Sequence, residues 1–364
     1  MGAGAGNACA NIAREFVRAG HEVVVVTTGH GNLPAEDVSN GIRVLRGPAK
    51  RRRIDRSTAF EQVVFMLGAT VRCLALLRAY HPDAVLAFFG LPSGGVAWFL
   101  RLVFGVPYIV SLRGGDVPGF RPYDFWLYHR LAVPLLRVVW RGADAVVANS
   151  GGLQQLAAAF DSRTSITIVP NGVDASRFWN EMRDWSEPRL LSVGRVVYQK
   201  GLDLAVQALG GMKDQAWEWR IAGDGPQSGN LRAQVEEAKI AGRVQMLGWT
   251  DTESLIHEYQ RASVFLFPSR HEGMPNAILE AMASGLPVIA TRIAGNEELI
   301  LDGETGRLVP PGDVEALRDS IAELLADGTI RERMGRAAHE RVVAEYGWAA
   351  TADRYLTMLE EAGH

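Results

Sequence analysis

The sequence has few cysteines, and the residue types that commonly bind metal ions are scattered along it. Cys9 and Cys73 form neither a disulfide framework nor a metal-binding pattern, which fits a reducing compartment. His81, His129 and His271 have no partners at metal-ligand spacing, so we expect solvated or capping roles for them. No Asp-x-Asp pair occurs, although this pair commonly holds a divalent cation. We therefore expect no metal site and a cytoplasmic location.

A signal peptide and a clear membrane span are also lacking. The most apolar stretch, Gly94 to Leu112, contains Arg101 and is interrupted by Gly105 and Pro107. A buried helix followed by a strand explains this stretch better than a membrane span does.

The length and the charge distribution divide the chain into two halves. A chain of 364 residues exceeds a comfortable single core, so we expect two domains. Residues 1–180 hold 19 Lys/Arg against 12 Asp/Glu, a net charge of +7, whereas the remainder holds 19 against 29, a net charge of −10. The first half is therefore the better candidate for contact with an anionic membrane surface or an acidic acceptor, and nothing indicates nucleic acid.

Strand and helix patterns alternate throughout, which predicts the α/β class with parallel sheets and helices on both faces. A turn-forming PNGVD segment opens a polar, strandless stretch at Pro170–Trp185. We predict domains at 1–175 and 176–345, followed by a C-terminal helix within 346–364. The predicted strands are His21–Thr28, Ile42–Arg46, Ala84–Phe89, Pro107–Leu112, Ala145–Ala148, Ser165–Val169, Arg189–Val193, Glu218–Ala222, Val244–Leu247, Val264–Phe267 and Val288–Thr291.

The first strand of the first domain is missing. A doubly wound domain begins with a strand before its first glycine loop, but this chain opens on the loop itself, Gly2 to Asn7, which contains the candidate binding residues Gly4 and Gly6. A helix is predicted from Asn7 to Ala19. Losing a central strand would expose two neighbouring strand edges, so we expect the start of the sequence, rather than a true loss, to explain the gap.

The segment from Val264 to Thr291 is the most informative part of the chain. Its strand stops at Pro268, a polar loop follows, and a helix is predicted to begin near Pro275, where proline suits the first turn. This β–loop–α–β pattern places Glu272 just before a helix N-terminus and Glu280 inside the helix. Such a terminus presents free N–H groups to anions.

Glu272 and Glu280 are eight residues apart, a rise of roughly 12 Å over a helical path. That is too far for both to act on one bond, so the pair is expected to hold two hydroxyl-bearing parts of one extended ligand. The alternative is two surface glutamates that flank a helix start, where acidic residues are common.

A second motif, SVGRVVYQKG (Ser192 to Gly201), follows a strand and opens a helix. It places Arg195 and Lys200 at the mouth of a crevice, where open α/β sheets bind ligands. The alternative is two solvated basic residues at a helix start, a placement that the helix dipole disfavours.

Together these segments resemble glycosyltransferase family 4, whose retaining enzymes have the GT-B architecture and carry Glu-x7-Glu and Gly-Arg-x4-Lys-Gly signatures. The resemblance covers the chain from about Gly2 to Glu360 and is strongest from Ser192 to Pro311. It implies two Rossmann-like doubly wound domains that face a cleft, with the donor bound mainly by the second. It also implies that the last helix, about Trp348–Glu360, crosses back to brace the first domain.

The resemblance further implies transfer of a sugar from a nucleotide diphosphate sugar to an acceptor hydroxyl, with retained anomeric configuration and no covalent intermediate. In that family the first glutamate contacts the donor sugar and the second the ribose, roles that fall on Glu272 and Glu280. Arg195 and Lys200 match the cations that stabilise the leaving diphosphate, each worth perhaps ~10²-fold in rate. With two cations and no Asp-x-Asp, we expect a metal-independent site without a cofactor.

Further candidates lie in three turns. Gly223 lies in a GDGP segment that resembles the family's G-x-G-P turn, although an ordinary tight turn would explain this sequence equally well. Gly248 stands where the family recognises the base. Backbone N–H groups near Met274 and Asn276 are implied to contact sugar or phosphate, and the alternative for Asn276 is a helix cap. The substrate-binding candidates from these turns are Gly223, Gly248, Gly273, Met274, Pro275 and Asn276.

The segment Ser111 to Asp116 departs from the family pattern. Many members have His-Gly-x-Asp here, whereas this chain has Arg113 before the Gly-x-Asp that ends in Asp116. An arginine could bind an anionic acceptor or the diphosphate instead.

Two features of the first half bear on the acceptor. The basic run Lys50 to Arg53, with Arg56, is either solvated surface or a dock for anionic lipid, at about 1 kcal/mol per basic residue. An aromatic patch could touch a lipid acceptor if it is exposed, or form core if buried. It consists of Phe120, Tyr123, Phe125, Trp126 and Tyr128.

We therefore predict a glycosyltransferase of glycolipid or cell-surface polysaccharide synthesis, with a saccharide or lipid-linked acceptor, on the inner face of the plasma membrane. Two rivals stay open. A nucleotide-sugar-binding protein without transferase activity draws support from the missing strand and Arg113, and an epimerase could use the same architecture.

Overall fold

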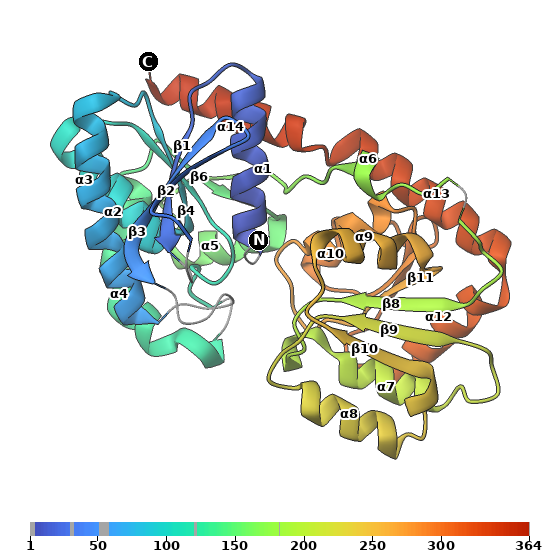
Figure 1. Ribbon diagram of the computed structural model, residues 1–364. Coiled ribbons are helices and arrows are strands. Elements are labelled where there is room, and N and C mark those ends of the chain that lie inside the picture. Colours follow the sequence, from blue (N-terminus) through green and yellow to red (C-terminus); the bar gives the residue numbers. More distant parts are fainter. Residues whose placement is uncertain (1–3, 30–32, 51–57, 120–121, 182, 364) are drawn as a thin grey trace. The chain divides into compact units, whose positions relative to one another are not determined.

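The computed structural model describes residues 4–29, 33–50, 58–119, 122–181 and 183–363. It consists of two compact units, one formed by Met1–Asn171 with Trp348–His364 and the other by Gly172–Gly347 (Figure 1). Both units are α/β. The change of unit falls inside the PNGVD turn, whereas the sequence analysis put it at residue 175.

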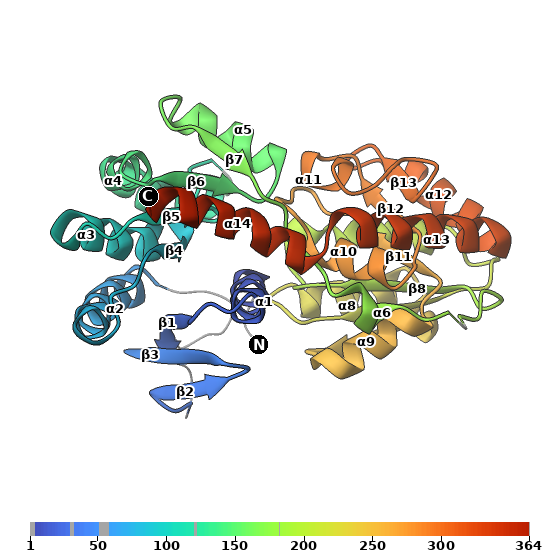
Figure 2. The ribbon, with the colours of Figure 1, turned by 90° about the horizontal axis from the view of Figure 1, so that it is seen from above.

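The first unit contains two sheets. Its three-stranded sheet has the order β1-β3-β2 and its four-stranded parallel sheet the order β4-β5-β6-β7 (Figure 2). Within the described residues, no strand joins β1 to β4, which agrees with the strand missing from the sequence pattern. The strands are β1 (Val24–Gly29), β2 (Glu36–Ser39), β3 (Ile42–Lys50), β4 (Val85–Phe88), β5 (Tyr108–Ser111), β6 (Ala145–Ala148) and β7 (Ile166–Ile168).

One strand pair corrects the expectation of purely parallel sheets. β2 runs antiparallel to β3 through a two-residue turn, Asn40–Gly41, in which both residues have positive φ (51° and 77°). Asn-Gly is the favoured sequence for such a hairpin. β2 itself is exposed along its whole length, so it has no apolar alternation by which it could have been predicted.

The first helix corrects another expectation. α1 spans Gly4–Arg18, so Gly4 and Gly6 lie in its first turns and not in a loop. Each residue added to an existing helix gains a backbone hydrogen bond, which offsets the roughly 1 kcal/mol cost of a helical glycine. The other helices are α2 (Ala59–Ala79), η1 (Phe89–Ser93), α3 (Gly94–Phe104), α4 (Pro122–Arg141) and α5 (Gly151–Phe160).

The apolar stretch Gly94 to Leu112 is a helix followed by a buried strand, α3 and β5, as predicted. The C-terminal helix α14 (Trp348–Gly363) belongs to the first unit. Its Tyr355 hydroxyl lies 2.7 Å from Ser111 Oγ, and Thr351 donates to the Pro170 carbonyl at 3.1 Å. Its apolar side packs with α1 and β5 in one buried cluster, so this helix completes the core of the first unit.

The second unit has one six-stranded parallel sheet, in the order β10-β9-β8-β11-β12-β13, with a buried apolar cluster on each face. Its strands are β8 (Arg189–Val193), β9 (Glu218–Ala222), β10 (Val244–Gly248), β11 (Val264–Phe267), β12 (Val288–Thr291) and β13 (Gly306–Val309), the last not predicted. Its helices are α6 (Ala175–Phe178), η2 (Tyr198–Lys200), α7 (Leu202–Gly210), α8 (Ser228–Glu237), η3 (Ala241–Arg243), α9 (Thr252–Arg261), α10 (Asn276–Ala283), α11 (Ala294–Glu297), α12 (Val314–Ala326) and α13 (Gly328–Glu345).

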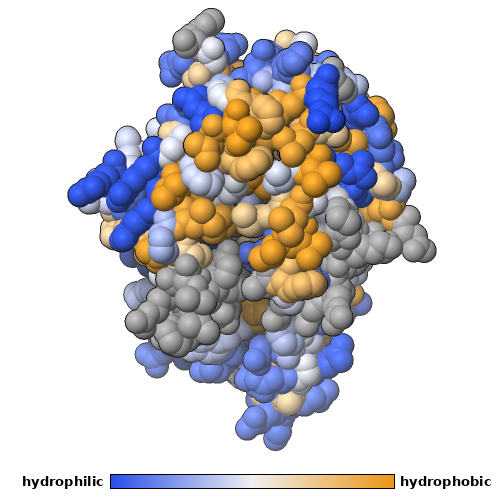
Figure 3. All heavy atoms as spheres, turned by 90° about the vertical axis from the view of Figure 1, so that its left-hand side faces the viewer, coloured by the Kyte–Doolittle hydropathy of each residue, from blue (hydrophilic) through white to orange (hydrophobic). Residues whose placement is uncertain are grey.

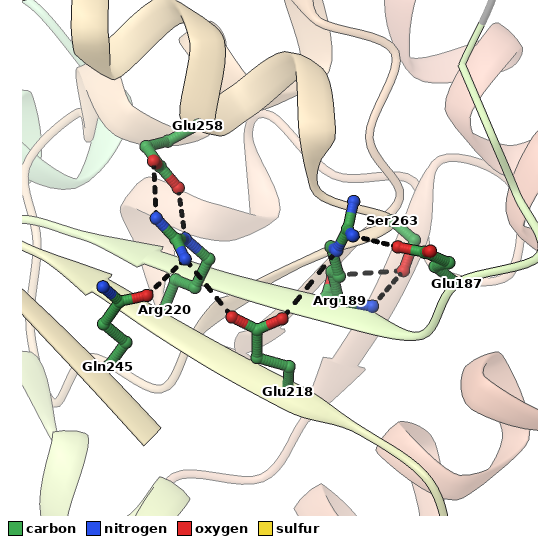
Figure 4. A network of polar contacts seen from close by, with 7 residues as sticks. All are labelled: Glu187, Arg189, Glu218, Arg220, Gln245, Glu258 and Ser263. Atoms are coloured by element: carbon green, nitrogen blue, oxygen red, sulfur yellow. Dashed lines mark hydrogen bonds and ion pairs between the residues drawn. The ribbon is translucent and has the colours of Figure 1, made fainter. Parts of the chain in front are cut away.

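A charged network lies near the amino ends of β8 and β9 (Figure 4). Arg220 donates from Nε and Nη2 to both oxygens of Glu258 on α9, at 2.6 and 2.9 Å. Glu218, at the start of β9, lies 3.3 Å from Arg220 and 3.8 Å from Arg189. These charges are paired with one another, so we regard this end of the sheet as structural.

Candidate active site

Three loops meet at the carboxyl ends of β8, β9 and β10, and glycines let them touch. The Gly223 N–H donates to the Gly248 carbonyl at 2.7 Å. A Cβ on Gly223 would lie 2.0 Å from the Gly194 carbonyl oxygen, and both residues have positive φ (138° and 144°). Only glycine allows this approach. The backbone of Gly223 therefore contacts both Gly248 and the loop that carries Arg195, so two predicted positions lie together.

The structure brings together two predicted residues that are far apart in the sequence. Lys200 Nζ lies 2.6 Å from Glu272 Oε1, and the two side chains are only 18% and 10% exposed. The same ammonium lies 4.6 Å from the centre of the Phe267 ring. A charge-assisted pair in such a shielded position fixes both side chains at the edge of the sheet.

A second ion pair fastens the same two loops and was missed from the sequence. Arg270 donates to both oxygens of Asp203 at 2.8 and 2.6 Å, and this contact raises the pKa of Arg270. The Gln199 amide side chain donates to the His271 carbonyl at 2.9 Å. Sequence spacing carries no signal for these contacts, because Asp203 and Gln199 come from the segment after β8, whereas Arg270 and His271 follow β11.

The loop after β11 rests on α11. A Cβ on Gly295 would lie 2.0 Å from the Gly273 carbonyl oxygen, so only glycine lets the Glu272 loop pack this closely on α11. Gly295 was not among the residues predicted from the sequence. Met274 and Pro275 are buried, which leaves the backbone as the part of the loop that a ligand could contact. Pro275 is the N-cap of α10, and Asn276 is its first helical residue.

Glu280 lies on α10 with its carboxylate turned into the unit. Burial raises its pKa to about 7, while a hydrogen bond from the Tyr259 hydroxyl, 2.9 Å from Oε2, opposes that rise. This carboxylate has lost contact with water and receives one hydrogen bond from the protein. It can therefore accept further hydrogen bonds from the hydroxyl groups of a ligand.

The first-unit candidates lie after β5. Asp116 is buried, and its oxygens accept the backbone N–H groups of Arg113 at 2.9 Å and Gly90 at 2.8 Å. Burial raises the pKa of Asp116. Both oxygens thus hold the turn together, which is a structural role.

Within the described residues, no group of three or more His, Cys, Asp or Glu side chains could hold a metal ion. Residues 51–57, with most of the basic run, lie outside the described part of the chain, as do the side chains of the aromatic patch.

Two α/β units, the second with glycine-lined loops and a lysine–glutamate pair at the carboxyl edge of its sheet, define the class: a glycosyltransferase with the GT-B fold. The chain belongs to glycosyltransferase family 4. Residues 3–172 match the family described as Glycosyl transferase 4-like domain, and residues 177–341 match Glycosyl transferases group 1. The protein is therefore a glycosyltransferase, and the binding-protein and epimerase rivals are disfavoured.

A named relative agrees with this assignment, and solved structures share the fold. The chain is 30% identical to the GDP-mannose-dependent alpha-(1-6)-phosphatidylinositol monomannoside mannosyltransferase of Mycobacterium tuberculosis, over 88% of this chain and 83% of that one. Sucrose-phosphate synthase from Thermosynechococcus elongatus superposes with a TM-score of 0.83 at 24% identity, covering 96% and 91% of the two chains. HepE from Anabaena in complex with UDP-glucose superposes with a TM-score of 0.78 at 18% identity, covering 99% and 96%.

Replacing Gly295 by Ala should displace the Glu272 loop, because the new Cβ would collide with the Gly273 carbonyl. A shift of about 1 Å in a positioning loop can cost roughly 10²-fold in turnover. Sugar-transfer kinetics measure the effect, and Gly229→Ala is the matched control, since a Cβ there has nothing within 4 Å. Equal turnover of both variants would contradict the proposed role of Gly295.

Replacing Glu280 by Gln should change how stability depends on pH. In the folded protein the Glu280 pKa is about 7, above its ordinary 4.5, so the folded state holds this proton more tightly than the unfolded state. The stability from this group is complete below about pH 4.5 and is lost as the pH rises towards 7. Thermal unfolding of the ligand-free protein should therefore show the variant gaining on the wild type between pH 5 and pH 8. A constant difference across that range would contradict the raised pKa.

Proposed function

We propose that the protein transfers a sugar from a nucleotide diphosphate sugar to an acceptor hydroxyl with retention of configuration and without a metal ion. The Lys200–Glu272 pair at the edge of the second sheet is the observation that carries the proposal. HepE, with the same fold, was crystallised with UDP-glucose, which supports a nucleotide-sugar donor here.

Each residue of the pair has its own task. Lys200, with Arg195 from the same loop, stabilises the diphosphate as it leaves, so fixed cations do the work that a divalent cation does elsewhere. Glu272 orients Lys200 before the donor arrives and then positions the donor sugar. Glu280 accepts the ribose hydroxyls. Departure and attack occur on the same face of the sugar, so no protein nucleophile is required.

We further propose that the first unit docks on the cytoplasmic face of an anionic membrane, where it meets a lipid-linked acceptor of glycolipid or cell-surface polysaccharide synthesis. The mycobacterial relative is named for a phosphatidylinositol mannoside, which supports a lipid acceptor. The two cysteines within the described residues are unpaired, which fits a reducing compartment.

The docking face is the outer side of α2. Phe60, Val63, Leu67 and Val71 follow one another at helical spacing and are 54 to 76% exposed. The opposite side of α2 packs into the unit through Phe65 and Ala69. Figure 3 shows hydrophobic side chains gathered on the side of the first unit where α2, α3 and α4 lie.

The composition of α2 favours lipid over a protein partner. By length and composition, Phe60–Arg78 is the one helix of the described chain that could cross a membrane, yet only 11% of it is buried. Glu61 is its sole acidic residue and serves in the N-terminal capping box with Thr58. The sequence just before the helix contains Lys50 to Arg53 and Arg56. An apolar helix face that follows a basic segment in the sequence is a pattern suited to an anionic lipid surface.

Nucleoside diphosphate release from a panel of UDP-, GDP- and ADP-sugars, measured in EDTA, tests the proposed reaction. Lys200→Ala should lower turnover by about 10²-fold, because a fixed cation at the leaving group is lost. Lys213→Ala is the matched control, since Lys213 is exposed in a turn of the same unit. Release that requires added Mg²⁺, or full turnover without Lys200, would overturn the metal-independent mechanism.

Co-sedimentation with vesicles that contain about one third anionic phospholipid tests the docking face. The wild type should bind, and Leu67→Glu with Val71→Glu should reduce binding roughly tenfold or more, because each apolar side chain contributes about 1.5–3 kcal/mol when buried. Val343→Glu replaces another exposed apolar residue, on α13, and should bind like the wild type. Absence of vesicle binding, or a dimer in solution that the double variant disrupts, would contradict the lipid assignment.

A further inference from the structure

Arg113 has a guanidinium group that is only half used. Its Nη1 donates to Asn171 Oδ1 at 2.6 Å, and its Cζ lies 4.5 Å from the centre of the Phe88 ring. Its Nε and Nη2 are buried, and neither has a hydrogen-bond partner. These two nitrogens form one edge of the guanidinium, with two parallel N–H groups.

In other arginines of this protein, the corresponding Nε/Nη2 edge donates two hydrogen bonds to a carboxylate. Arg141 binds Asp161 through Nε and Nη2 at 2.9 and 2.7 Å, and Arg220 binds Glu258 through the same two nitrogens. Arg307 and Glu323 repeat the arrangement. The Nε/Nη2 edge of Arg113 is thus the part of the side chain that takes two oxygens of one anion.

Other buried arginines do not share this deficit. Within the described residues, Arg331 and Arg341 also lack a partner, but each at Nε alone, while their Nη atoms donate to carbonyl groups. Arg113 as a residue is half-buried, but the two nitrogens of this edge are fully buried and unpaired. This is costly, since each unsatisfied buried donor costs about 1–3 kcal/mol and charged donors more. Such a site calls for a partner.

The neighbouring titratable groups do not supply the missing anion. Both oxygens of Asp116 are engaged by backbone N–H groups. The charge of Arg113 acts on the Cys9 thiol of α1 and lowers its pKa, but burial outweighs this and raises that pKa to about 11, which leaves the thiol neutral. Arg113 has no ion pair with any described carboxylate, although it lies at the carboxyl end of β5, the edge at which parallel sheets bind ligands.

We propose that the Nε/Nη2 edge of Arg113 binds an oxyanion with two available oxygens, a phosphate or a carboxylate, carried by one of the two substrates. The site rests on the proposed transfer reaction for its purpose. A neutral imidazole at this position would offer one N–H group, whereas arginine offers two and a charge. Arg113 is therefore a specificity residue for an anion-bearing substrate.

Inorganic phosphate is the probe, and the Nε–H resonance of Arg113 in a ¹⁵N-correlated NMR spectrum is the readout. The resonance, assigned by its loss in Arg113→Met, should shift saturably as phosphate is added. Calorimetry should show phosphate affinity at this site falling roughly tenfold or more in Arg113→Met, because a charge-assisted two-point contact is lost. Arg163→Met, an exposed arginine of the same unit, is the matched control and should bind like the wild type.

An Nε–H resonance that phosphate leaves unchanged would overturn the proposal, even if the methionine variant folds poorly. Equal phosphate binding by both variants would do the same. If the phosphate shift is reversed by a nucleoside diphosphate, the donor supplies the oxyanion; if it persists, the acceptor does. Donor-dependent nucleoside diphosphate release by the wild type tests the transfer reaction separately, so the two ideas can fail independently.

Discussion

The close approach of backbones at the carboxyl edge of the second sheet is the constraint on which the rest of the site depends. Gly223 lies against Gly194, Gly201 against Pro268, and Gly295 against Gly273, each at a distance that a Cβ would forbid. These contacts bring loops from separate strands within reach of one another. Only then can single side chains, such as Lys200 and Glu272, bridge them.

The two ends of that sheet use charge in different ways. At the amino ends of the strands, Arg189, Glu218, Arg220 and Glu258 neutralise one another, so the network stabilises the strands and offers little to a ligand. At the carboxyl edge, the Lys200–Glu272 pair lies beside the glycine-lined loops. Lys200 is already held in place there, so it can exchange its carboxylate partner for a diphosphate with little rearrangement.

The core of the first unit joins the two ends of the chain. α14 packs with α1 and β5 in one buried apolar cluster, although it comes from the far end of the sequence. The unit's two unusual features, the exposed apolar side of α2 and the unpaired edge of Arg113, both concern partners.

The sequence by itself determined the fold class, eleven of the thirteen described strands to within four residues, and the segments that carry Arg195, Lys200, Glu272 and Glu280. Apolar runs and glycine–proline punctuation are local signals, so they can be seen along the chain. The Arg270–Asp203 ion pair and the contact of Gly295 with the Gly273 carbonyl were decided by tertiary structure. Both depend on distances between residues that are far apart in the sequence, and no local pattern encodes these.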